Sequence, residues 1–150
     1  MKRKKITPSQ LSLFSRSPVV GAWWNELRVQ GLFKDKLPER NELENQLLKD
    51  GIRHEELLIA NLKKQGYRIA ELGGKQTEID YQSSIDAMAE GYDYIWQASL
   101  NNREMRGTAD LLEKIKGSSP FGDWTYQPIE CKPVSYTHLT LTTIGCVYIK

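Results

Sequence analysis

The spacing of apolar residues predicts helices in the first half of the chain. Residues 7–10 (Thr-Pro-Ser-Gln) combine an N-cap residue, a proline at the first helical position and a glutamine that can close a capping box. A short helix should therefore begin there and end before Ser17-Pro18. Residues 39–65 carry apolar side chains at helical intervals, which predicts a longer helix whose apolar stripe is broken once near Gly51.

The second half of the chain alternates apolar and polar residues in the manner of strands. A short helix is expected at 83–90. Strands are expected at 67–72, 92–100, 106–115 and 124–133. The pair Asn101-Asn102 is typical of a turn between neighbouring strands, and a loop at 116–122 should separate the last two. The pattern predicts an α/β fold in which a mixed sheet with a three-strand meander is flanked by helices.

Composition narrows the class of protein only a little. The chain has 150 residues, enough for one domain, and its 39% hydrophobic and 27% charged residues are usual for a globular protein. No apolar run approaches the length needed to cross a bilayer, so we expect a cytoplasmic protein with no membrane partner. A net charge of +2 gives no argument for nucleic acid, and two cysteines are too few to hold an iron–sulfur cluster.

Candidate chemistry lies on the last two predicted strands, which carry Asp110 and the segment Glu130-Cys131-Lys132. Residues two apart in a strand share a face, so Glu130 and Lys132 should point the same way while Cys131 turns into the core. If the strands are antiparallel neighbours, the carboxylates of Asp110 and Glu130 converge and need a cation such as Mg²⁺, which prefers oxygen ligands. The Lys132 ammonium can then stabilise charge on a phosphate or orient a metal-activated water.

These segments resemble those of the RecB-like nucleases in the PD-(D/E)xK superfamily. The resemblance covers residues 6–133 and includes His54-Glu55 in the predicted long helix. It implies a restriction-endonuclease-like core and an exonuclease-like deoxyribonuclease that cuts DNA with Mg²⁺ or Mn²⁺, for example in DNA repair. Some relatives hold an iron–sulfur cluster with four cysteines, which this chain lacks, so we expect no cluster.

The resemblance also implies roles for individual residues. The catalytic residues would be Asp110, Glu130 and Lys132. The metal ligands would be His54, Asp110, Glu130 and the backbone carbonyl of Cys131. Glu55 is expected to be a charge on the surface of the helix.

The chain departs from this family after Lys132. The family continues into a helix, whereas residues 134–141 are rich in threonine, have no helical period and resemble a translated sequencing adapter. We therefore expect a partial nuclease domain at 1–133, truncated after the third core strand, and a non-native tail at 134–150. Loss of the closing helix would leave this fragment unstable or inactive. The alternative function is a non-catalytic nucleic-acid-binding or scaffolding module with the same fold.

Overall fold

The computed structural model describes residues 5–32, 41–131 and 147–148, except for the side chains of residues 28, 29, 130, 147 and 148. Its helices are α1 (Pro8–Arg16), α2 (Pro18–Val29), α3 (Glu42–Lys64) and α4 (Glu78–Glu90). Its strands are β1 (Ile69–Glu71), β2 (Tyr94–Asn101), β3 (Arg106–Ser119), β4 (Gly122–Glu130) and β5 (Val147–Tyr148).

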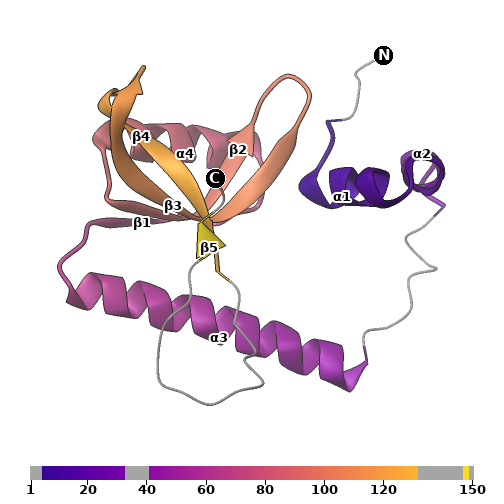
Figure 1. The fold of residues 1–150 in the computed structure, drawn as a ribbon, viewed down its shortest axis with the longest axis horizontal. Helices are drawn as coiled ribbons and strands as arrows, with labels where there is room; N and C mark the ends of the chain where they lie inside the picture. The colour runs from indigo at the N-terminus through magenta and orange to yellow at the C-terminus, as the bar shows by residue number, and fades with distance from the viewer. Residues whose placement is uncertain (1–4, 33–40, 132–146, 149–150) are drawn as a thin grey trace.

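The strands form one sheet in the order β1-β2-β3-β4-β5 (Figure 1). β1 is parallel to β2, whereas β2, β3 and β4 are antiparallel neighbours and make the meander that the sequence predicts. The expected α/β class, with a mixed sheet flanked by helices, is thereby confirmed. β5 comes from the segment expected to be a non-native tail, and its Val147 pairs with Glu130 at the end of β4.

Apolar side chains pack on both faces of the sheet. The α4 cluster consists of Ala70, Ala87, Met88, Ile95, Ala98 and Leu112. The α3 cluster consists of Leu58, Ile59, Leu111, Ile129 and Cys131. Leu111 and Leu112 are consecutive in β3 and belong to different clusters, because side chains in a strand alternate between its faces. α3 therefore packs on one face of β3, and α4 packs on the other face.

Prolines mark where α1 and α2 begin. α1 begins at the expected capping box, in which the Gln10 backbone N–H donates to the Thr7 hydroxyl, and it ends before Ser17. Pro18 then opens α2, a helix that was not predicted because this proline was interpreted only as the end of α1. Proline is equally suited to the first turn of a new one. An isolated parallel bridge between Ile6 and Met105 places α1 beside the β2–β3 hairpin (Figure 1).

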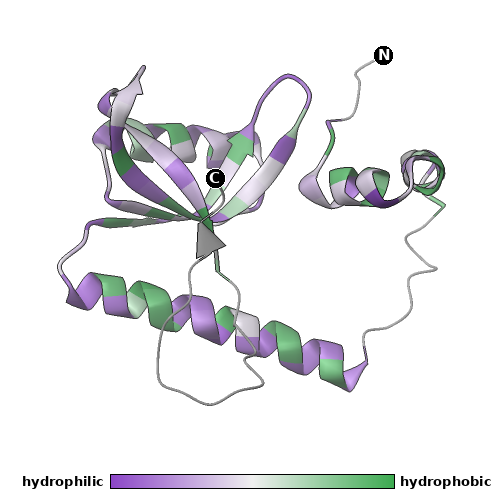
Figure 2. Ribbon diagram, viewed as in Figure 1, coloured by the Kyte–Doolittle hydropathy of each residue, from purple (hydrophilic) through white to green (hydrophobic). Residues whose placement is uncertain are grey.

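The predicted long helix is α3, which runs without interruption through Gly51, where its apolar stripe is broken. A glycine in a helix costs only about 1 kcal/mol, which the surrounding helix formers offset. Figure 2 shows apolar residues along the whole of α3. Only part of that apolar stripe packs against the sheet. Leu58 is 6% exposed, whereas Leu43 is 67% and Leu47 is 60% exposed.

α4 begins before the predicted start at residue 83, at a capping box of its own. Thr77 is the N-cap, and its backbone N–H donates to the Asp80 carboxylate at 3.1 Å. Hydrogen bonds from the side chain and backbone of Thr77 hold the pKa of the Asp80 carboxyl below its usual range. Gly91 ends the helix in the left-handed conformation, with a φ of 70°.

The predicted loop at 116–122 is wrong, because β3 and β4 continue through most of it. Ser119 pairs with Gly122, so only Pro120 and Phe121 form the turn. Gly122 has a φ of 136°, and a Cβ there would lie 2.7 Å from the ring of Trp124. Glycine and proline therefore mark the tip of a long hairpin here.

Candidate functional site

Asp110 lies in β3, half-buried, beside the backbone of β4. Its Oδ2 accepts a hydrogen bond from the backbone N–H of Cys131 at 3.4 Å. Leu111 pairs with Ile129 in the antiparallel register of these strands, so Asp110 and Glu130 are the next residues along each strand. The backbone thus brings the two predicted carboxylate positions together.

The remaining residues of the predicted β4 motif are only partly described. The side chain of Glu130 and the whole of Lys132 lie outside the described residues. Cys131 is 6% exposed and belongs to the α3 cluster, which confirms that it turns into the core. Metal binding by the Cys131 carbonyl stays a prediction.

His54 is half-buried in α3, one turn before the residues that anchor this helix to the sheet. Among the side chains that the structure describes, which do not include that of Glu130, no three from His, Cys, Asp or Glu lie close enough together to hold a metal ion. The assignment of His54 as a ligand that acts with Asp110 therefore stays a prediction.

The prediction that Glu55 is a surface charge is wrong. Glu55 is half-buried, and its Oε2 accepts hydrogen bonds from Trp96 Nε1 at 3.2 Å and Gln97 Nε2 at 2.9 Å, both on β2. The reason lies in the period of the helix, because Leu58 and Ile59 follow Glu55 by three and four residues and share its face. That spacing was visible in the sequence, whereas nothing in it pointed to Trp96 or Gln97.

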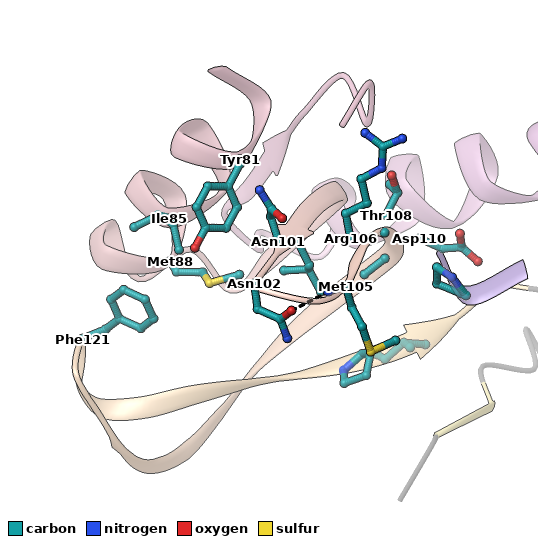
Figure 3. Close-up of a pocket in the computed structure, with 16 residues that line it drawn as sticks. Tyr81, Ile85, Met88, Asn101, Asn102, Met105, Arg106, Thr108, Asp110 and Phe121 are labelled. Carbon is teal, nitrogen blue, oxygen red and sulfur yellow. Dashed lines mark hydrogen bonds between the residues drawn. The ribbon is translucent and has the colours of Figure 1, made fainter. Parts of the chain in front are cut away.

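A cavity of about 670 Å³ opens along β3. Its lining residues are Pro8, Tyr81, Ile85, Met88, Leu100, Asn101, Asn102, Met105, Arg106, Gly107, Thr108, Ala109, Asp110, Phe121, Pro128 and Ile129. Figure 3 shows Phe121 and Asp110 at opposite ends of this group. Asp110 and Arg106 are the charged residues of a lining that is mainly apolar. Of the predicted site residues whose side chains the structure describes, Asp110 lines this cavity and His54 does not.

Comparison of the chain with protein-family models, curated proteins and solved structures finds no match. Among the helices that the structure describes, none combines the length and apolar character required to cross a bilayer. A function can therefore be proposed only from the residues of this chain and their geometry.

Proposed function

We propose that this chain carries the metal-binding part of a Mg²⁺- or Mn²⁺-dependent nuclease that hydrolyses DNA phosphodiester bonds, on a restriction-endonuclease-like core. The observation that carries the proposal is the register of β3 and β4, which sets Asp110 and Glu130 at neighbouring positions on adjacent strands. Two carboxylates brought together repel each other, and a divalent cation offsets that repulsion.

The donor chemistry of these residues fits such a cation. The Asp110 carboxylate is half-buried and held by the Cys131 N–H, so one oxygen is already oriented. Mg²⁺ takes one or two carboxylates and leaves positions for water and a substrate phosphate. Asp110, Glu130 and the Cys131 carbonyl would supply oxygen ligands, and His54 would add an imidazole, which suits Mn²⁺ better than Mg²⁺.

The residues of the chain would have separate roles in hydrolysis. A bound divalent ion polarises a phosphoryl oxygen and lowers the pKa of its water. Asp110 and Glu130 would fix where that ion sits, and Lys132 would stabilise negative charge on the phosphate. The Cys131 N–H limits the directions that the Asp110 carboxylate can take.

The test measures Mn²⁺ binding by calorimetry and cleavage of a labelled DNA oligonucleotide for the whole chain, Asp110→Asn and Glu130→Gln. Asp123→Asn is the matched control, because Asp123 is an exposed aspartate on β4. We expect both site variants to weaken Mn²⁺ binding at least about tenfold, because the loss of even an outer-shell partner of a metal ligand typically costs about 10- to 100-fold. Asp123→Asn should bind as the wild type does. Unchanged binding in both site variants would overturn the metal site.

The alternative is a non-catalytic nucleic-acid-binding module with the same fold, which a nuclease differs from in its metal-dependent cleavage. A DNA-binding module would retain DNA in a filter-binding assay without metal and would not cut it when Mn²⁺ is present. The nuclease proposal instead requires that cleavage, where it is seen, disappears with EDTA and in Asp110→Asn.

A further inference from the structure

β2 departs from regular strand geometry directly opposite Asp110. Gln97 has a φ of 56°, a left-handed conformation that residues other than glycine rarely adopt. Trp96 pairs with Leu111 and Ala98 pairs with Ala109, so Gln97 and Asp110 occupy the unpaired positions between these two pairs. Irregularities of this kind often lie beside functional sites, where they redirect a side chain.

The irregularity changes which face the side chains of β2 take. Trp96 and Gln97 are consecutive, yet both donate to the same Glu55 oxygen on α3. Ala98, the next residue, is fully buried in the α4 cluster. A regular strand would place Trp96 and Ala98 on one face, so β2 changes face at Gln97.

β3 changes face at the corresponding position. Leu111 belongs to the α3 cluster, whereas Ala109 packs against the α4 cluster. Residues two apart in a regular strand share a face, so the change falls on Asp110 between them. Asp110 therefore lies where β3 changes face, directly opposite the left-handed Gln97.

Two contacts hold the Gln97 side chain. Its Nε2 donates to Glu55 at one end. At the other end its Oε1 lies against Gly74, where an added Cβ would come within 2.9 Å of that oxygen. Gly74 itself has a φ of 60°, so this position favours glycine on two grounds. The side chain is fitted between α3 and the segment that follows β1.

We propose that Gln97 is a positioning residue for the metal site of the proposed function, on which this inference rests. Its hydrogen bond to Glu55 fastens the irregular part of β2 to α3, and the change of face in β3 turns the Asp110 carboxylate toward the backbone N–H of Cys131. Without that bond, β2 returns to an extended conformation and Asp110 takes the direction of a regular strand.

The first measurement needs no metal. Amide hydrogen exchange of the Cys131 N–H, followed by NMR, reports whether Asp110 still accepts its hydrogen bond. Gln97→Ala and Glu55→Ala should speed that exchange about tenfold, because both remove the tether. Gln97→Gly should do the same, because glycine takes left-handed and extended conformations with equal ease, so this variant loses the tether without adding backbone strain. Unchanged exchange in Gln97→Ala and Gln97→Gly overturns the proposal.

Glu55→Gln is the decisive variant, because its amide oxygen still accepts hydrogen bonds but carries no charge. We expect it to keep the exchange rate and the Mn²⁺ affinity within about twofold of wild type, whereas Glu55→Ala and Gln97→Ala weaken Mn²⁺ binding about tenfold. Equal losses in Glu55→Gln and Glu55→Ala would show that Glu55 acts through its charge, and positioning would be wrong.

Matched controls come from exposed residues of the same types. Glu56→Ala changes the next residue of α3, and Gln82→Ala changes an exposed glutamine that bonds only locally to Asp86 on α4. Both should match wild type in exchange and in affinity. If wild type shows no Asp110-dependent Mn²⁺ binding, the proposed function fails, while the metal-free exchange rates still decide whether Gln97 orients Asp110.

Discussion

Ile59→Ala and Leu57→Ala remove the same number of carbons from α3 and should have very different effects. Ile59 is 4% exposed within the α3 cluster, whereas Leu57 is 60% exposed. Each buried carbon lost costs about 0.8 kcal/mol in transfer free energy, and the cavity left behind adds to that, so we expect Ile59→Ala to destabilise by about 3 kcal/mol. Leu57→Ala should change the free energy of unfolding by less than about 0.5 kcal/mol.

Urea denaturation followed by far-UV circular dichroism measures both values. If the unfolding free energy falls with urea concentration at the same slope in both variants, the two free energies can be compared directly. The corresponding loss of Tm for Ile59→Ala is roughly 6–12 °C in a chain of this size. The packing of α3 matters for the site because the same helix carries His54 and Glu55 to the sheet. Equal destabilisation by the two variants would refute the placement of α3 against β3 and β4.

Two further predictions concern the α4 face of the sheet. Ser84 is fully buried and accepts the Ser99 backbone N–H at 2.9 Å, so Ser84→Ala should cost about 1–3 kcal/mol in urea denaturation by leaving that donor unsatisfied; a loss below about 0.5 kcal/mol would contradict the contact. Burial, with a smaller contribution from Asp93, raises the pKa of Tyr126 to about 12, and its hydroxyl donates to the Tyr92 carbonyl at 2.7 Å. The pKa of Tyr126 in the folded state is raised above the usual 10. The stabilisation that this hydroxyl contributes is therefore fully present below pH 10 and is lost as the pH rises toward 12. Tyr126→Phe should therefore lose less stability than wild type as the pH rises from 10 toward 12 in denaturation curves. An identical loss of stability in Tyr126→Phe and wild type would contradict this prediction.

Local signals predicted the parts of the fold that depend on neighbouring residues. The capping residues at Thr7 placed α1, and Asn101-Asn102 placed the turn between β2 and β3. The meander then followed, because short connections make antiparallel neighbours. The adjacency of Asp110 and Glu130 on the backbone was therefore predictable, since it needs only the register of one hairpin.

Features set by distant contacts were missed. A left-handed glutamine has no signature in the sequence, and the partner that holds Gln97 lies 42 residues earlier, at Glu55. The residues around Gly117 were taken as a loop, although pairing with β4 carries β3 through them. Glu55 itself was misjudged because its charge was given more weight than its place on the packed face of the helix.

The most direct test of the metal site is a crystal structure of the whole chain grown with Mn²⁺, with the ion located by its anomalous scattering. The account predicts one peak at coordination distance, roughly 2.2 Å, from carboxylate oxygens of both Asp110 and Glu130. It is contradicted if β3 and β4 are well ordered while these two carboxylates point apart and no Mn²⁺ lies between them.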